Sequence, residues 1–366
     1  MYKKLLIFIP HIGGGGVEKN FFIITNFLAK KLDNVTVITI NKEFKKKLHK
    51  KIKIISPNTG KWKNSSIYVK YIISILILIK TLLSDKNYLL FSFQANWYAI
   101  IISKLFGVKI ISRSNTAPEG WSKSIIKKFF YKMIIGFADE IIVNSIEFKK
   151  SLKEFFNVNS TCIYNPLDKA KILKLGNKKV KFDFFKQKNY LKIINIGRFT
   201  DQKNQLLILK SIKYLKDRIP IKFLIAGRGV NFNILKNFIN ENKLNKKVYL
   251  MNFMDNPYPY LKLSDIFILS SNYEGLPNVL LEAQSFKKII ISTKCPTGPK
   301  EILLNGKAGL FFKMNDYKDL SKKIIYVFKN KKKFKNKVQL GYSNLYRFSE
   351  GKNLDLYYKL VLRNLS

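Results

Sequence analysis

The sequence is poor in cysteine and histidine, and this shortage excludes several kinds of protein. The two cysteines, Cys162 and Cys295, are too few for a disulfide scaffold or for a zinc site built from several cysteines. The two histidines, His11 and His49, provide no ligand set for a His-based metal centre. So little cysteine is typical of a protein that works in the reducing cytosol.

Acidic residues and arginine are also scarce, which leaves a large excess of lysine. The 366 residues include 68 Lys and Arg, of which six are Arg, against 23 Asp and Glu, so the formal net charge is +45. A surface this positive attracts anionic lipid headgroups, nucleic acid or nucleotide phosphates. We favour an anionic membrane surface as the partner, with a compositional bias toward Lys, Asn and Ile as the alternative. Nucleic acid is not expected, because the sequence has no Arg-rich recognition module with stacking aromatics.

Apolar residues are abundant enough for real hydrophobic cores. They make up 47% of the chain, and aromatics make up 14%, whereas a disordered polycation would be poor in both. At about 150 residues per domain, the length predicts two domains. The apolar run near the start ends at Pro10, which is too early for a signal peptide, so we interpret Leu5–Ile9 as a buried first strand.

Two segments resemble membrane-binding helices. In Tyr71–Leu83, the flanking Lys70 and Lys80 leave an apolar core shorter than the ~20 residues of a spanning helix. We interpret it as a buried helix, with a helix lying on a membrane as the alternative. In Ser122–Ala138, apolar residues recur at helical spacing and lysines fall largely between them. This pattern fits a basic helix on an anionic bilayer and a core-facing helix equally well.

Short apolar runs alternate with helix-length segments along the whole chain. The predicted strands are Leu5–Ile9, Val35–Ile40, Ile52–Ser56, Tyr88–Phe91, Val108–Ser112 and Glu140–Val143, then Leu191–Ile196, Ile221–Ala226, Val248–Met251, Asp265–Leu269 and Ile289–Ser292. Such alternation of fully apolar strands with helices predicts parallel sheets covered on both faces. We therefore expect an α/β protein with two doubly wound domains facing across a cleft. Their bounds are 1–168 and 189–348, with a linker at 169–188 and a helix at 349–366 that packs back on the first domain.

Four consecutive glycines follow the first strand and open a helix. In the segment Gly13–Lys19, their backbone N–H groups can approach an anion at the helix N-terminus. The segment is neither a G-x-G-x-x-G fingerprint nor a phosphate-binding P-loop. A tight strand-to-helix turn explains the glycines equally well.

A second loop carries two cations at the start of the second strand series. Arg198 and Lys203 lie in the segment Gly197–Asn204, directly after a predicted strand. Arginine binds phosphate in a bidentate manner and lysine binds it as a point charge, so the pair can neutralise a diphosphate.

A third motif places two glutamates seven residues apart around a helix start. Glu274 precedes Pro277, which suits the first turn of a helix, and Glu282 falls on the second turn of that helix. The N-terminus of this helix would direct its positive dipole end toward a ligand. A carboxylate on the second turn can accept two hydroxyls, as a ribose requires.

Taken together, these segments resemble the retaining glycosyltransferases of family 4, which have the GT-B fold. The segments that carry the resemblance are GGGGVEK (13–19), ADEIIVNS (138–145), IYNPLD (163–168), GRFTDQKN (197–204), EGLPNVLLE (274–282) and CPTGPKEIL (295–303). The last of them looks like the subgroup that transfers N-acetylhexosamines or hexoses during assembly of bacterial surface glycans.

The resemblance implies roles for individual residues. Arg198 and Lys203 would hold the donor diphosphate and Glu274 would position the donor sugar, which makes these three the catalytic residues. The implied donor-binding residues are Gly15, Gly16, Gly197, Gly275, Leu276, Pro277, Asn278, Val279 and Glu282, with Glu282 on the ribose. On the acceptor side the implied residues are Glu18, Arg113 and Asn115, in loops where relatives carry other polar pairs.

The resemblance also implies the reaction. A sugar would move from a UDP-sugar, with retention of configuration, to a polyprenyl-diphosphate-linked or other glycan acceptor at the inner face of the cytoplasmic membrane. Asp201 and Asp255 stand alone rather than in a DxD pair, so we expect no metal and no cofactor. The alternatives are a GT-B-fold nucleotide-sugar epimerase, a basic nucleic-acid-binding protein and a non-catalytic glycosyltransferase-like subunit.

Overall fold

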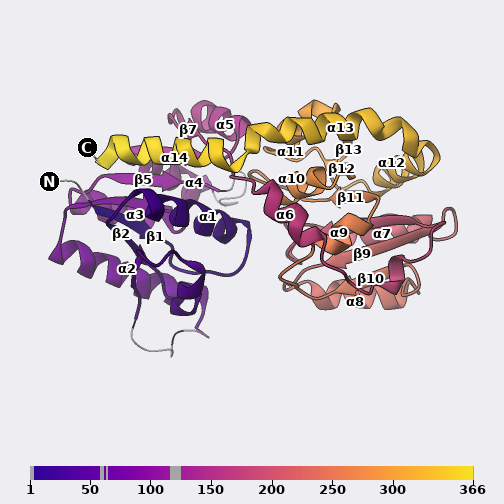
Figure 1. Ribbon diagram of the computed structural model, residues 1–366, viewed down its shortest axis with the longest axis horizontal. Coiled ribbons are helices and arrows are strands. Elements are labelled where there is room, and N and C mark those ends of the chain that lie inside the picture. The colour runs from indigo at the N-terminus through magenta and orange to yellow at the C-terminus, as the bar shows by residue number, and fades with distance from the viewer. Residues whose placement is uncertain (1–3, 58–61, 63–64, 116–124, 366) are drawn as a thin grey trace. The chain divides into compact units, whose positions relative to one another are not determined.

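The chain folds as two compact units, each described here by itself. The computed structural model describes residues 4–57, 62, 65–115 and 125–365, with the side chains of residues 125–128 excepted. Unit 1 comprises Met1–Pro166 and Glu350–Ser366, and unit 2 comprises Leu167–Ser349. Figure 1 shows the two units and their helices and strands.

Unit 1 is built on a parallel sheet of seven strands. Their order is β3-β2-β1-β4-β5-β6-β7. The strands are β1 (Lys4–Phe8), β2 (Val35–Ile38), β3 (Lys53–Ile55), β4 (Tyr88–Ser92), β5 (Ile110–Arg113), β6 (Glu140–Val143) and β7 (Thr161–Cys162). The inner strands are buried along most of their length because helices cover both faces of the sheet.

Two layers of helices cover this sheet. They are α1 (Gly16–Lys31), α2 (Ile67–Ser84), α3 (Asn96–Leu105), α4 (Ile125–Ile135), α5 (Ile146–Phe156) and α14 (Glu350–Leu365), with a short 3-10 helix η1 at Lys42–Lys47. Leu5 and Ile7 of β1 pack in one core with α1 and α14. Leu6 and Phe8 point to the opposite face and pack in a second core with α2 and α3. The alternating sides of one strand thus separate the two layers.

Unit 2 repeats this plan with a six-stranded parallel sheet. Its order is β10-β9-β8-β11-β12-β13. The strands are β8 (Leu191–Ile196), β9 (Ile221–Ala226), β10 (Val248–Met251), β11 (Ile266–Leu269), β12 (Ile289–Thr293) and β13 (Leu310–Phe312). The helices are α6 (Lys169–Gly176), α7 (Gln205–Leu215), α8 (Phe232–Glu241), α9 (Tyr258–Leu263), α10 (Asn278–Ser285), α11 (Pro299–Ile302), α12 (Tyr317–Asn330) and α13 (Lys335–Ser343), with 3-10 helices η4 (Asp183–Phe185), η5 (Leu304–Gly306), η6 (Lys331–Phe334) and η7 (Asn344–Phe348).

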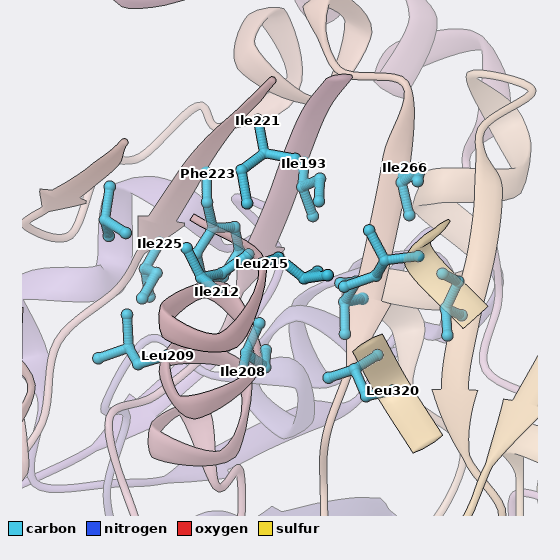
Figure 2. Packing of buried hydrophobic residues seen from close by; sticks show 14 of the residues in the cluster. Ile193, Ile208, Leu209, Ile212, Leu215, Ile221, Phe223, Ile225, Ile266 and Leu320 are labelled. Atoms are coloured by element: carbon cyan, nitrogen blue, oxygen red, sulfur yellow. The ribbon is translucent and has the colours of Figure 1, made fainter. Parts of the chain in front are cut away.

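The core of unit 2 lies between α7 and the sheet. Figure 2 shows Ile208, Leu209, Ile212 and Leu215 on α7 and apolar residues such as Ile193 on the strands. The spacing of the four α7 residues, at helical intervals, gives the helix one continuous apolar face. This core fixes the strands whose ends carry the predicted motifs, and the expected pair of doubly wound α/β units is confirmed.

The segment 169–188, expected to be a linker, is instead packed into unit 2. Its first half forms α6, whose Gly176 lies so close to Phe286 that a Cβ there would come within 2.4 Å of the ring. Its second half places Phe182 against Tyr249 and Tyr260, at ring-centroid distances of 5.5 and 5.0 Å. Phe185 is buried. The sequence did not reveal this packing, because lysines outnumber the few apolar residues, such as Ile172 and Phe185, that are buried in this segment.

The two segments that resembled membrane-binding helices, α2 and α4, are only partly buried. Within the part of the chain described, α2 is long and apolar enough to cross a membrane, and 28% of it is buried, although core helices of soluble proteins meet the same criterion. The expectation of a buried helix is therefore only partly met, since Ile72 and Leu76 are more than half exposed. Of the predicted segment 122–138, residues 122–124 lie outside the described part. In the rest, Ile135 is buried while Phe129 and Met133 are exposed.

Candidate functional site

The motifs of unit 2 meet where the strand order of its sheet reverses. In an open parallel sheet, ligands bind at the carboxyl ends of the two strands on either side of such a reversal. Here those strands are β8 and β11. The loop Gly197–Asn204 follows β8, and the loop Ser270–Pro277 follows β11. The topology therefore brings the Arg198–Lys203 motif beside the Glu274 motif.

Hydrogen bonds join these two loops. The Gln202 side-chain amide donates to the Tyr273 carbonyl at 3.0 Å, and the Asn272 backbone amide donates to the Gln202 carbonyl at 2.8 Å. The Ser270 hydroxyl donates to the Lys203 carbonyl at 2.7 Å. These bonds fix the backbone that carries both charged side chains.

Lys203 and Glu274 form an ion pair at the centre of this region. Their Nζ and Oε1 atoms lie 2.5 Å apart, and the side chains are 16% and 7% exposed. Such low exposure strengthens the attraction compared with an exposed pair. The two residues that the sequence placed on diphosphate and sugar are thus in direct contact.

Arg198 differs from Lys203 in being exposed. The neighbouring Phe199 is fully buried and anchors the loop, and the Gln205 side chain donates to the Arg198 carbonyl at 2.9 Å. No hydrogen bond or ion pair of the Arg198 guanidinium occurs within the described residues. A fixed backbone with an exposed guanidinium suits the binding of an incoming anion.

The loop that carries Glu274 is supported from behind by the segment CPTGPKEIL. The Thr297 hydroxyl donates to the Glu274 carbonyl at 2.6 Å. Gly298 has a φ of +74°, and a Cβ there would lie 2.0 Å from the Gly275 carbonyl oxygen. Burial raises the pKa of the nearby Cys295 thiol to about 12, with Glu274 contributing, so this cysteine is not a nucleophile at neutral pH. The segment shapes the loop, a role that motif spacing alone did not reveal.

Helix α10 begins at Asn278 with Pro277 in the preceding position. Its first-turn amides lie at the end of the Glu274 loop, where they give this side of the site a positive potential. Glu282, on the second turn, is 6% exposed and accepts a hydrogen bond of 3.3 Å from the Tyr258 hydroxyl. Sequence reasoning missed Tyr258, because a tyrosine that orients a carboxylate leaves no characteristic spacing.

A similar reversal in unit 1, between β1 and β4, holds the glycine motif. The Glu18 side chain accepts backbone hydrogen bonds from Gly13 at 3.3 Å and Gly15 at 2.8 Å. It also accepts one from the Gln94 side chain at 3.3 Å. Glu18 thus caps the N-terminus of α1 with its own carboxylate. The Gly15 amide is therefore already occupied by an anionic group, while Gly16 is exposed.

Arg113, expected on the acceptor side, is fully buried within unit 1. Its guanidinium donates to the Tyr357 hydroxyl at 2.9 Å and to the Asn165 side chain at 2.7 Å, and it also bonds to the Asn115 side chain. The ring of Phe93 lies 5.7 Å from the guanidinium carbon. Arg113 therefore ties strand β5 to α14 rather than facing a ligand. Asn115 is only partly buried and lines a cavity.

Within the ranges the structure describes, no three His, Cys, Asp or Glu side chains come together as a metal site would require. The charged residues at the carboxyl ends of β8 and β11 include the exposed Arg198 and the Lys203–Glu274 pair.

A comparison with known protein families finds a match within unit 2. Residues 177–343 match the family "Glycosyl transferases group 1". Most of unit 2 is thus similar to this glycosyltransferase family. The matched range contains the Arg198, Lys203, Glu274 and Glu282 positions, so the family resemblance inferred from the motifs is confirmed.

Curated relatives include several glycosyltransferases. An uncharacterized glycosyltransferase of Methanocaldococcus jannaschii is 35% identical over 220 residues, which are 56% of this chain and 53% of that protein. The chain therefore spans about half the length of this relative. A Campylobacter jejuni N-acetylgalactosaminyltransferase, named for its action on a diphospho-undecaprenol-linked sugar, is 27% identical over 66% of this chain and 68% of its own length. The Erwinia amylovora amylovoran biosynthesis glycosyltransferase AmsD is 24% identical over 83% of this chain.

Solved glycosyltransferases have the same fold. Anabaena HepE in complex with UDP and glucose superposes with a TM-score of 0.76 at 15% identity, over 100% of this chain and 99% of its own. TarM superposes with a TM-score of 0.77 at 12% identity over similar shares. At these identities the likeness shows the fold alone, and that fold is GT-B.

Proposed function

We propose that the chain is a retaining glycosyltransferase that moves an N-acetylhexosamine or hexose from a UDP-sugar to a lipid-linked surface glycan. The observation that carries the proposal is the buried Lys203–Glu274 pair at the β8–β11 reversal, with the exposed Arg198 beside it and α10 starting at the end of the same loop. The names of the relatives that act on undecaprenol-diphosphate-linked sugars, and the UDP-bound solved structure, support the donor and the acceptor class.

The proposed mechanism assigns charge stabilisation to unit 2. Departure of UDP places negative charge on its diphosphate, and Arg198, Lys203 and the N-terminal amides of α10 stabilise that charge. The acceptor hydroxyl attacks from the face that the diphosphate leaves, which retains the configuration, and the leaving phosphate takes the hydroxyl proton. Glu274 orients Lys203 and the donor sugar and does not act as a nucleophile. Glu282 accepts the ribose hydroxyls. Because protein cations balance the diphosphate, we propose a reaction without metal.

We further propose that unit 1 works against the inner face of the cytoplasmic membrane. The helices α2, α3 and α4 contain six lysines and no Asp or Glu. They also carry exposed apolar side chains, among which Leu76 is 59%, Leu105 79% and Phe130 53% exposed. Apolar side chains with surrounding lysines suit the surface of an anionic bilayer. The proposed acceptor, a polyprenyl-diphosphate-linked glycan, lies in such a membrane.

A panel of UDP-sugars incubated with polyprenyl-diphosphate-linked acceptors, with products identified by mass spectrometry, tests the reaction. Lys203→Ala and Glu282→Ala should lower kcat/KM by about 10²-fold or more, the usual effect of removing a charge-stabilising group. Lys210→Ala, which removes an exposed lysine on α7, is the matched control. Near-normal kcat/KM in both site variants would reject the site. Conversion of a UDP-sugar without acceptor would instead indicate an epimerase, and activity lost in EDTA and restored by Mg²⁺ would reject the metal-free reaction.

Sedimentation with vesicles tests the membrane surface. The chain should bind vesicles that contain anionic phosphatidylglycerol more strongly than neutral phosphatidylcholine vesicles, and added salt should weaken this preference. Equal binding to both kinds of vesicle would reject an electrostatic role for the lysines.

A further inference from the structure

Unit 1 contains a cavity that none of the predicted site residues except Asn115 lines. Its volume is about 460 Å³, within the range of about 300–1,000 Å³ that is typical of small-molecule sites. Its walls come from α2, α3, α4, the first turn of α1, and the loops after β4 and β5. It therefore lies at the carboxyl ends of the strands of unit 1, where the glycine turn capped by Glu18 also lies. It is on the face of the sheet covered by α2, α3 and α4.

The wall of the cavity is aromatic, and none of the described residues that line it is charged. Six aromatic side chains line it: Tyr68, Tyr71, Phe93, Trp97, Tyr98 and Tyr131. The Trp97 and Tyr131 rings meet edge to face in this wall, with their centroids 3.7 Å apart. Aliphatic residues such as Ile134 complete the lining. An uncharged apolar group is the ligand that such a wall favours.

The two asparagine side chains in the wall are already engaged within unit 1. Asn96 accepts from the Ser92 hydroxyl at 2.7 Å and donates to the Arg113 carbonyl at 2.9 Å. Asn115 donates to the Phe93 carbonyl at 3.0 Å, and its oxygen accepts from Arg113. A sugar needs several donors and acceptors that are free to turn toward it, and neither asparagine is free; among the wall amides, only the Gln94 Oε1 atom lacks a partner in the described part of the chain. This argues for a hydrocarbon occupant over a carbohydrate.

The cavity is continuous with the exposed apolar face of the helix layer. Tyr68 and Tyr98 line the cavity and are 76% and 49% exposed, so they form its rim. On α2, Ile72 and Leu76 follow Tyr68 at intervals of four residues and are 58% and 59% exposed. Tyrosine suits a boundary between lipid and water, because its ring is apolar and its hydroxyl can meet headgroups. A chain leaving a bilayer could thus enter the cavity without crossing water.

We propose that this cavity binds the hydrocarbon chain of the lipid that carries the acceptor, and that the aromatic wall holds the isoprenoid units nearest its diphosphate. The proposal rests on the proposed function only in that the acceptor is lipid-linked. The proposal gives α2, α3 and α4 a role beyond membrane binding. They select a lipid chain and hold its polar end at the carboxyl ends of the strands, where the glycine turn lies.

Calorimetric binding of free isoprenoid alcohols to the full chain, without membranes, tests the proposal. Farnesol should bind more tightly than geraniol, by about fourfold for each additional CH₂ that becomes buried. Ile134→Trp, which fills the cavity, should weaken farnesol binding at least tenfold. Leu105→Ser, on an exposed part of α3 outside the cavity, should weaken sedimentation with anionic vesicles but leave farnesol binding unchanged.

UDP binding, measured on the same samples, separates this proposal from the proposed function. Farnesol binding without UDP binding would support the cavity while rejecting the donor site, and UDP binding without farnesol binding would do the reverse. Farnesol affinity that is unchanged in Ile134→Trp would overturn the proposal. Binding of an N-acetylhexosamine oligosaccharide in place of farnesol would also overturn it. Should Ile134→Trp fail to fold, Tyr71→Ala, which removes part of the wall, must weaken farnesol binding for the proposal to stand.

Discussion

Removing the ammonium group of Lys203 should destabilise unit 2 as well as weaken the proposed sugar transfer. In Lys203→Met, the Glu274 carboxylate keeps its position at 7% exposure without the cation that lies 2.5 Å away. Breaking a buried ion pair by removing one partner costs about 3–5 kcal/mol. Because the Lys203 side chain is 16% exposed, water can partly replace it, and we expect about 3 kcal/mol. For a domain of this size that loss corresponds to a fall of about 6–12 °C in Tm.

Differential scanning calorimetry on the full chain measures this effect. Because each unit has its own core, the fall should appear in the transition of unit 2. Lys4→Met provides a matched control, since the Lys4–Asp85 pair of unit 1 is 45% and 31% exposed and its loss should leave the free energy of unfolding nearly unchanged. The double variant Lys203→Met with Glu274→Gln should recover part of the loss, through a coupling of about 1–3 kcal/mol. Additive effects in the double variant would show that the pair does not form in solution, and would refute the reasoning.

Three further predictions concern the support of the site and its titratable groups. Gly298→Ala should displace the Gly275 carbonyl and so lower both the stability of the protein and its affinity for UDP, measured by titration. The control Gly351→Ala, where an added Cβ meets open space, should leave the UDP affinity unchanged. Burial lowers the pKa of Lys288 to about 8, so between about pH 8 and 10.5 the unfolded chain binds a proton that the folded chain does not. The free energy of unfolding, measured in urea, should rise across this window by up to about 3 kcal/mol, and a parallel profile in Lys288→Met would contradict this. Alkylation of the native protein should modify the partly buried Cys162 before the fully buried Cys295, and equal rates would count against the burial of Cys295.

Much of the fold could be predicted because its strands are short runs of β-branched and aromatic residues with helices between them. Runs such as Ile221–Ala226 were predicted with the observed bounds. The strands β7 and β13 were missed, since two or three residues carry no periodicity. The start of α7 at Gln205 could not be predicted, because Asn204 adopts a left-handed conformation with a φ of +46° that its neighbours do not reveal.

The sequence predicted the candidate site only where a residue type is closely tied to one kind of chemistry, as Arg and Lys are to phosphate binding. Arg198, Lys203 and Glu274 follow two strands that lie beside each other, so position along the chain was sufficient to bring them together. The position of Arg113 in its loop suggested a ligand contact, but its environment depends on Tyr357, which is 244 residues away in the sequence. The exposure of the α2 face was equally hidden, because an apolar helix has the same composition whether protein or lipid covers it.

The return of α14 to unit 1 makes this unit discontinuous, with the whole of unit 2 inserted into it. During synthesis, unit 2 can therefore complete its sheet while unit 1 still lacks the helix that supplies Leu354, Tyr357 and Val361 to its core. Until α14 emerges, Arg113 has no Tyr357 hydroxyl to bond, and the part of the sheet face that α14 covers remains exposed. The unit whose synthesis begins first is therefore the unit that finishes folding last, and this interval is when a growing chain would most need protection from aggregation.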